Sequence, residues 1–306
     1  MSGRRRLLSV AKWVYVLLVS GFLAWAVWQT GGQLEGWKGW VLEPAAYAFV
    51  ACWMLMALVL GAAWAQVLSL YLGLRLDVSE WLPIQAAAWV GRYLPGKVGL
   101  MAGKLVLLER PELEVKPLAF SVLFEQVAFV VAGVILALVL SPPVEVFQVR
   151  WLQAVDTAWG RWGMAVAVAV AFFLMIHVVA SRLQVVARPG VLQGAALVSF
   201  YLFAHAVAGL GLHFILQVVL ADDAPSLAYA IGVLAAANVA GIVAVFAPAG
   251  IGVRELVLVL GLSPFISIEE ALAMSAVMRL LTVIADLAFS VIAGGGRLFR
   301  MVHRRG

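Results

Sequence analysis

The sequence predicts an all-α integral membrane protein with about six full transmembrane helices and two shorter, broken hairpins in an inverted repeat. Hydrophobic residues make up 65% of the 306 residues and charged residues only 12%, and the mean hydropathy is +1.04. A soluble domain of this size does not have such a composition. Two apolar regions are each interrupted by a break rich in proline and glycine. Since no charged stretch is long enough to form an extramembrane domain, residues 1–306 are expected to form a single polytopic membrane domain.

Six segments are apolar enough to cross a bilayer, which requires about 20 residues. They cover approximately residues 11–28, 43–72, 118–140, 161–180, 193–219 and 270–293. The first follows Arg4, Arg5 and Arg6 and is interpreted as an uncleaved span, not as a signal peptide, because many more spans follow. The second is longer than a bilayer requires, so it is expected to tilt. The twelve tryptophans cluster near span ends, a position typical of interfacial belts.

The first broken segment lies between the second and third spans. Its two arms cover about 81–94 and 97–109 and meet at Pro95 and Gly96. Proline removes a backbone donor and glycine permits a sharp turn, so one helix ends there and another begins. At about 1.5 Å per residue each arm is about 20 Å long, which is less than the roughly 30 Å of the hydrocarbon core. The segment is therefore predicted to be a re-entrant hairpin that protein or water surrounds.

Three cations flank this first break. Arg92 precedes it, and Lys97 and Lys104 follow it. The two lysines are seven residues apart, so both project from the same face of a helix. A helix that begins inside a membrane also presents unpaired amides and the positive end of its dipole. Together these groups predict a site for an anionic group, such as a phosphate, within the bilayer. The alternative is that the cations lie in a loop and snorkel to the interface.

A second broken segment covers about residues 226–262 and has its break at Pro248-Ala-Gly-Ile-Gly252. Arg254 and Glu255 follow this break directly. The first arm, 226–247, has 22 residues, so the sequence leaves open whether it is re-entrant or crosses completely. The residues expected to form the turns of the two hairpins are Pro95, Gly96, Gly99, Pro248, Gly250 and Gly252.

The two halves of the chain share this organisation. Ser121 and Glu125 correspond to Ser275 and Arg279 at an offset of 154, and the two breaks correspond at an offset of 153. Repeat 1 covers about 43–140 and repeat 2 about 193–293, and each reads as a span, a broken hairpin and a span. One span lies between them, so the second repeat starts on the opposite side of the membrane. Inverted repeats whose broken helices meet near the midplane are the architecture of many secondary transporters.

Basic residues predict the orientation of the chain. Counted from a cytoplasmic N-terminus, thirteen Lys and Arg residues lie in cytoplasmic segments and three in outside segments. This is a strong positive-inside bias. A multi-pass protein of the bacterial inner (plasma) membrane with both termini in the cytoplasm is expected. The remaining five cations are assigned to membrane depth: Arg92, Lys97, Lys104, Arg254 and Arg279.

Three acids are also assigned to membrane depth, namely Glu125, Glu255 and Asp286. Eight isolated charges at about 2.5–3.5 kcal/mol each would exceed the net stability of a typical protein, so they must face one another, water or substrate. Arg279 and Asp286 share one helix face, and a network of Glu125, Arg279 and Asp286 with the hairpin cations is expected, as counter-charges or as gates. A buried ion-pair network that only stabilises the fold is the alternative. The cations exceed the acids by two, which leaves positive charge for an anionic ligand.

Other functional classes find little support in the sequence. His205 and His213 have no carboxylate or cysteine neighbours at ligand spacing, so no metal site is expected. Gly250 and Gly252 lack the third glycine and the βαβ pattern of a dinucleotide site. No arrangement of a nucleophile and a base is present, so no cofactor and no catalytic residues are expected. The net charge of +5 reflects the asymmetry of the loops and does not indicate a nucleic-acid partner, and the lone Cys52 excludes an internal disulfide.

Three motifs, in this order, resemble the membrane domain of the lysylphosphatidylglycerol synthase family. They are G-R-Y-L-P-G-K-V-G with Lys104, S-V-L-F-E-Q, and P-A-G-I-G-V-R-E. The resemblance covers nearly the whole chain. In that family this domain translocates lipid, and two-part members carry a cytoplasmic synthase domain after it. The resemblance therefore implies a stand-alone member without the synthase domain. The typical acidic–basic pair after the first motif is Glu125-Gln126 here.

These features together predict a flippase that translocates an anionic phospholipid or a lipid-linked glycan precursor. Arg92, Lys97, Lys104 and Arg254 are expected to bind the headgroup, and Glu125 is a candidate gate. A small-anion transporter or channel is the first alternative. The second is an integral-membrane enzyme acting on a lipid phosphate, for which the sequence offers carboxylates but no recognisable arrangement. The sequence is compatible with a homodimer, and it leaves open the identity of the lipid and the direction and energy source of its transport.

Overall fold

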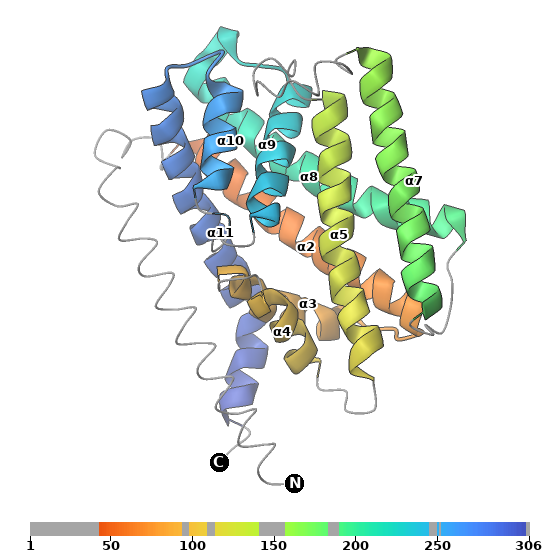
Figure 1. Cartoon of the computed structure of the whole chain (residues 1–306). Helices are drawn as coiled ribbons and strands as arrows, with labels where there is room; N and C mark the ends of the chain where they lie inside the picture. Colours follow the sequence, from red (N-terminus) through yellow and green to blue (C-terminus); the bar gives the residue numbers. More distant parts are fainter. Residues whose placement is uncertain are drawn as a thin grey trace.

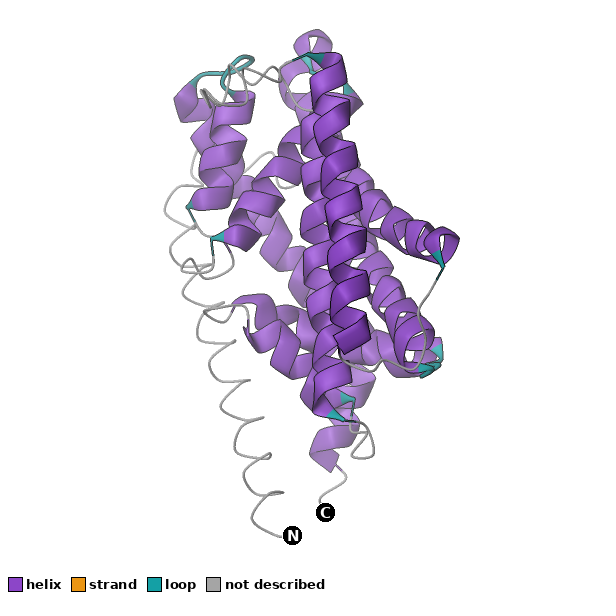
Figure 2. Cartoon of the chain, turned by 45° about the vertical axis from the view of Figure 1, so that its right-hand side comes forward, coloured by secondary structure: helices purple, strands orange, loops and turns teal. Residues whose placement is uncertain are grey.

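The computed structural model describes residues 43–93, 98–108, 114–140, 157–182, 190–244, 250 and 252–303. Helices make up nearly all of these ranges, which contain no strand (Figure 2). The elements are α2 (Pro44–Leu72), α3 (Val78–Trp89), η3 (Val90–Tyr93), α4 (Val98–Leu107), α5 (Val115–Leu140), α7 (Ala158–Arg182), α8 (Val191–Leu220), η6 (Ala221–Asp223), α9 (Leu227–Val243), α10 (Val253–Leu262) and α11 (Ile268–His303). The predicted all-α membrane fold is confirmed.

Five of the described helices are long and apolar enough to cross a membrane, namely α2, α5, α7, α8 and α11. They correspond to five of the six predicted spans, and the sixth, residues 11–28, lies outside the described residues. Many of the side chains of α7 that face away from the bundle are apolar, including Val166, Val170 and Leu174, which are more than half exposed. Such a surface suits contact with lipid chains. The chain is therefore a multi-pass membrane protein.

The two broken segments fold as pairs of short helices. In the first, α3 has 12 residues, η3 has four and α4 has ten. In the second, α9 has 17 residues and α10 has ten. Because about 20 helical residues are needed to cross a bilayer, the length of α9 favours a helix that stops inside the membrane. Lys97, Pro95, Gly96 and Pro248 lie outside the described residues, and Gly99, predicted as a turn residue, lies in the first turn of α4.

A close approach of backbones requires glycine at the second break. Gly250 has φ +71° and Gly252 has φ +86°, a left-handed conformation that a residue with a Cβ rarely adopts. A Cβ on Gly250 would also lie 2.6 Å from the Cα of Gly241 in α9. The turn therefore packs directly against α9. This contact places the first residues of α10 beside Gly241. A Cβ added to Gly241 would lie 3.2 Å from the Cβ of Arg254.

The helix contacts follow the correspondence between the two halves. α2 and α8 hold matching places in the two repeats, and they pack against each other. α3 packs against α11, and its counterpart α9 packs against α5. Likewise, α2 packs against α11, and α8 packs against α5. Figure 1 shows α9 and α10 reaching the centre from the upper end of the bundle, whereas α3 and α4 lie towards the lower end. A two-fold relation in the membrane plane predicts this arrangement. As a result, the described parts of the two broken segments approach each other in the middle of the bundle.

The central helix of this arrangement is α2, which packs against α3, α5, α8 and α11. Its apolar residues are buried on several sides, and Phe49, Trp53 and Trp64 are at most 1% exposed. Trp53 and Trp64 carry an indole N–H, and a buried indole N–H requires a hydrogen-bond acceptor. The acceptor of Trp53 is the carboxylate of Asp286, and that of Trp64 is the hydroxyl of Ser121. α2 thus connects the apolar core with the candidate site.

Candidate functional site

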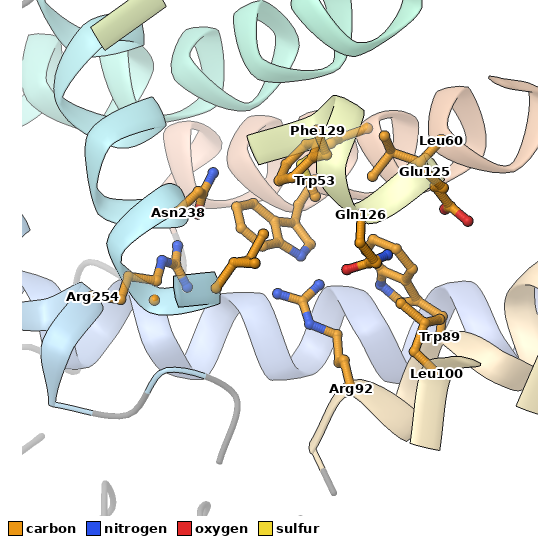
Figure 3. Close-up of a pocket in the computed structure, with 13 residues that line it drawn as sticks. Trp53, Leu60, Trp89, Arg92, Leu100, Glu125, Gln126, Phe129, Asn238 and Arg254 are labelled. Carbon is orange, nitrogen blue, oxygen red and sulfur yellow. The ribbon is translucent and has the colours of Figure 1, made fainter. Parts of the chain in front are cut away.

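A pocket lies where the two broken segments approach each other. Side chains from α2, η3, α5, α9 and α10 line it, including Trp53, Arg92, Gln126, Asn238 and Arg254. Figure 3 shows Arg92 and Arg254 entering from opposite sides, with Trp53 between them. Arg92 belongs to the first broken segment and Arg254 to the second. The structure therefore brings together two of the four cations that the sequence predicts for headgroup binding.

Arg92 is held by a buried carboxylate on α11. Asp286 is completely buried, and its Oδ1 lies 3.6 Å from Nη1 of Arg92. The indole nitrogens of Trp53 and Trp89 donate hydrogen bonds to the same oxygen at 2.9 and 2.7 Å. The hydroxyl of Tyr93 donates to Oδ2 at 2.6 Å. Three hydrogen-bond donors and one cation, from three elements, thus converge on one carboxylate, which satisfies a charge that would otherwise be costly to bury.

The same aromatic rings also contact the cations. The guanidinium carbon of Arg92 lies 4.8 Å from the ring centre of Trp89 and 5.5 Å from that of Trp53. The guanidinium carbon of Arg254 lies 4.8 Å from the ring centre of Trp53. A cation within about 6 Å of an aromatic face is attracted to the ring. Trp53 therefore contacts both arginines through its ring, and it contacts Asp286 through its N–H.

Arg254 is buried, and none of the described residues provides a counter-ion within ion-pair distance. Its exposure is 4%, and its Nε and Nη2 atoms have no hydrogen-bond partner. The neighbouring Glu255 is engaged elsewhere, since its Oε2 accepts from the amide of Gly252 at 2.7 Å and its Oε1 lies 3.5 Å from Nη1 of Arg279. Buried polar groups are almost always satisfied. Free donors on a buried cation that lines a pocket therefore indicate a place for an anion.

Lys104 and Glu125 form a separate ion pair. Both side chains are at most 1% exposed, and Nζ of Lys104 donates to Oε2 of Glu125. Nζ also lies 4.4 Å from the ring centre of Trp64, whose indole nitrogen donates to the hydroxyl of Ser121 at 3.2 Å. The other carboxylate oxygen of Glu125, Oε1, has no hydrogen-bond partner, and Glu125 lines the pocket. The structure thus engages Lys104 with Glu125, and the remaining carboxylate oxygen is buried.

The charges of this region can be counted among the described residues. Three of the cations assigned to membrane depth each lie beside an acid: Lys104 beside Glu125, Arg279 beside Glu255, and Arg92 beside Asp286. Arg254 is the remaining cation in the described part of this set. Each of the three acids thus lies beside one cation, in separate ion pairs and not in one network, and Arg279 pairs with Glu255 and not with Asp286. One positive charge is left over, and it lies at the pocket.

The residues that the sequence analysis missed are mainly aromatic. Assigning the tryptophans to interfacial belts is wrong for Trp53, Trp64 and Trp89, which are at most 4% exposed. Trp159 and Trp162 at the start of α7 are 88% and 56% exposed, as an interfacial position requires. Trp89 lies only three residues before Arg92, and this spacing was the signal that could have placed it beside the site. Nothing in the sequence pairs Trp53 with either arginine.

His205 has a structural environment. Its ring stacks on Phe129 with ring centres 4.0 Å apart, and its Nε2 lies 3.0 Å from the carbonyl oxygen of the same residue. Gly133 permits this packing, because a Cβ there would lie 2.8 Å from Nε2. Among the described residues, no group of three or more His, Cys, Asp and Glu side chains is placed to hold a metal ion.

No protein-family model matches the chain, and no curated protein matches it. Two features of the described residues bear on the function. One is a buried arginine, Arg254, without a counter-ion, and the other is a second arginine, Arg92, that approaches it from the other half of the chain.

The Lys104–Glu125 pair makes a testable prediction. Glu125→Met leaves the lysine buried and unpaired, so it should lower the free energy of unfolding by about 3–5 kcal/mol. The double variant Lys104→Met/Glu125→Met replaces the pair by two apolar side chains and should recover most of that loss. Thermal unfolding of both single variants and the double variant in the same detergent measures the coupling. Additive losses would show that the two side chains do not depend on each other.

Proposed function

We propose that this protein is a flippase that translocates an anionic phospholipid or lipid-linked substrate across a bacterial inner membrane. The observation that carries the proposal is Arg254, a buried cation with free donors that faces Arg92 across a pocket between the two broken segments. An anion in this pocket would receive charge-assisted hydrogen bonds, which are roughly twice as strong as neutral ones. A broken-helix site in the middle of a bundle is also where secondary transporters bind their substrates.

The lining of the pocket favours a lipid over a small soluble anion. Beside its polar side chains, the pocket is lined by Met56, Leu60, Leu100, Phe129 and Ile242. A site for a hydrated inorganic anion needs polar groups on most sides, whereas a lipid headgroup enters together with apolar chains. The mixture of two guanidinium groups and an apolar wall suits an amphipathic anion. A small-anion transporter or channel is the second candidate, and the experiment below separates the two.

The resemblance to the lysylphosphatidylglycerol synthase family supports the same proposal. The motif residues Arg92, Glu125 and Arg254 line the pocket, and Lys104 pairs with Glu125 behind it. Residues from all three motifs thus converge on one place in the bundle. We propose that the chain is a relative of the lipid-translocating domain of that family, and that Lys97 takes part in binding the headgroup.

The proposal is tested with the full chain in unilamellar vesicles. A fluorescent anionic phospholipid, labelled on its acyl chain and present in both leaflets, is bleached from outside, and translocation appears as loss of the protected fraction. The wild-type protein should accelerate this loss, and Arg92→Ala should slow it. Arg182→Ala is the matched control, because it removes the same charge from an exposed position at the end of α7. Chloride or phosphate flux without lipid movement would instead support the small-anion transporter.

The orientation forms part of the proposal. In Figure 1 the connection between α2 and α3, which contains Asp77, lies towards the lower end of the bundle, and the connection between α8 and α9, which contains Asp222, lies at the upper end. The start of α5, with Lys116, and the end of α7, with Arg182, also lie on the lower side, and the positive-inside rule favours that side as the cytoplasmic one. In a Cys52→Ala background, a membrane-impermeant thiol reagent applied to whole cells should label Asp222→Cys and spare Asp77→Cys. The reverse pattern would invert the proposed topology.

A further inference from the structure

We propose that the Lys104–Glu125 pair is a proton-binding site that couples the movement of the anion to a proton gradient. This inference rests on the proposed function and adds the energy source of the transport. Three observations carry it: a carboxylate oxygen of Glu125 without a partner, the complete burial of the pair, and the position of Glu125 at the wall of the pocket.

Two buried carboxylates of the described residues differ in how well their charge is stabilised. Asp286 accepts hydrogen bonds from three aromatic side chains through both of its oxygens and lies beside Arg92. Glu125 accepts from Lys104 through Oε2, and its Oε1 has no hydrogen-bond partner among the described residues. An ionised carboxylate can only accept hydrogen bonds, at about four positions on its two oxygens. Glu125 is therefore the carboxylate that gains more from a proton.

The helices around Glu125 offer few other places for this proton. α5 packs against α2, α4, α7, α8 and α9. The titratable or charged side chains that the structure describes on these helices close to Glu125, or across the pocket from it, are Lys104, Tyr71, Tyr201, His205, Arg92 and Arg254. The lysine and the arginines are cations already. Tyr201 is completely buried, interacts electrostatically with Glu125 and has a hydroxyl without a partner.

His205 is the other candidate for the proton among these side chains. It lies one helical turn away, where its Nε2 is 3.0 Å from the carbonyl oxygen of Phe129. No acid in the described part of the chain forms an ion pair with it, so a protonated ring would be an unpaired cation in the apolar core. A protonated Glu125 carries no charge of its own. The carboxylate is therefore the better proton acceptor.

Protonation of Glu125 changes the state of Lys104. A proton from the aqueous phase binds to the carboxylate and converts it to a neutral carboxyl, while the ammonium group of Lys104 keeps its own proton and loses its counter-ion. Because Glu125 lines the pocket, an anion bound there lies near this uncompensated cation. The anion balances the charge that the proton adds. Anion and proton thus each favour the binding of the other.

This linkage specifies how the two ligands move. Both are bound in the same state of the protein, so they cross the membrane in the same direction. An anionic lipid that enters on the more acidic side is carried with a proton to the less acidic side. The headgroup contact that the sequence predicts for Lys104 belongs to the protonated state, since Glu125 engages this lysine in the structure.

The first test is lipid movement in vesicles with a pH gradient. The full chain is placed in vesicles with acyl-labelled phosphatidylglycerol in the outer leaflet, and potassium with valinomycin holds the membrane potential at zero. Acid outside should make inward movement of the label at least about fivefold faster than acid inside, because coupling between two ligands usually reaches that factor. A protonophore should abolish the difference, and protein-free vesicles give the background. Equal rates in the two gradients would overturn the inference.

Variants assign the effect to Glu125. Glu125→Gln keeps the shape of a protonated carboxyl but does not titrate, and Lys104→Met/Glu125→Met removes the pair. Lipid movement that remains in these variants should not respond to the gradient. Glu269→Gln, which removes an exposed carboxylate from the first turn of α11, and His205→Gln should respond as the wild type does. A response that persists without Glu125, or that His205→Gln abolishes, would contradict the assignment.

The second test does not require lipid movement. In weakly buffered detergent, binding of dihexanoyl phosphatidylglycerol to the full chain should be accompanied by proton uptake, followed with a pH indicator dye. The wild type and Glu269→Gln should take up a proton, and Lys104→Met/Glu125→Met should not. Binding to the wild type without proton uptake would overturn the inference, and this measurement decides alone if the variants do not fold. Failure of the proposed function gives a different result, because no phospholipid would then be translocated in either gradient.

Discussion

Arg254→Met should abolish lipid translocation while the protein unfolds at the same or a higher temperature than the wild type. The arginine is buried without a counter-ion, and its Nε and Nη2 lack partners. Its replacement by an apolar side chain of similar length removes a desolvation penalty and loses the contact with Trp53, which is worth about 0.5–2 kcal/mol. These two effects oppose each other. An unpaired charge that does not stabilise the fold is typical of a position retained for function.

The effect on transport should be large, because Arg254 supplies charge-assisted hydrogen bonds worth about 1.5–3 kcal/mol each. Loss of one or two such bonds, about 1.5–6 kcal/mol in all, corresponds to a decrease in rate of about 10- to 10,000-fold in the vesicle assay. Arg254→Lys keeps the charge but not the planar group, so it should retain only part of the activity. Arg182→Met serves as the control for both the stability and the rate. A variant with Met at position 254 that translocates lipid normally would place the binding site elsewhere.

Asp286→Ala should produce the largest loss of stability among the site residues. The carboxylate accepts hydrogen bonds from Trp53, Trp89 and Tyr93 and lies beside Arg92. Its removal takes away the acceptor that three buried donors share and the counter-ion of one cation. Breaking a buried ion pair costs about 3–5 kcal/mol, and each orphaned donor adds about 1–3 kcal/mol. The sum is comparable to the whole stability of many proteins.

The measurement is thermal unfolding in detergent, with the yield of folded protein as a second readout. Asp286→Asn retains an acceptor for the two indoles but removes the charge, so its loss should be intermediate. Ser290→Ala is the matched control on the same helix, because Ser290 donates one neutral hydrogen bond of 2.8 Å to the carbonyl oxygen of Ala86. It should cost about 1 kcal/mol. If Asp286→Ala were no more destabilising than Ser290→Ala, the carboxylate would not organise the aromatic cluster.

Local features of the chain predict the elements of this protein well. Apolar runs of the length of a bilayer specify the long helices, because a membrane requires satisfied backbone hydrogen bonds and apolar side chains over about 20 residues. The break before Arg254 is also visible in the sequence, since Gly250 and Gly252 adopt backbone angles that favour glycine. The same reasoning assigns eight ionisable residues to membrane depth, because charged side chains are rare inside apolar segments and each needs a partner there.

The partners of those charges are a property of the tertiary structure. Lys104 and Arg92 both belong to the first broken segment, yet one lies beside Glu125 on α5 and the other beside Asp286 on α11. Trp53, 39 positions before Arg92 in the sequence, contacts both arginines because α2 crosses the centre of the bundle. Only the packing of the helices shows that Arg254 is left without a counter-ion. Charge type and burial depend on local sequence, whereas pairing depends on contacts between residues as much as 233 positions apart.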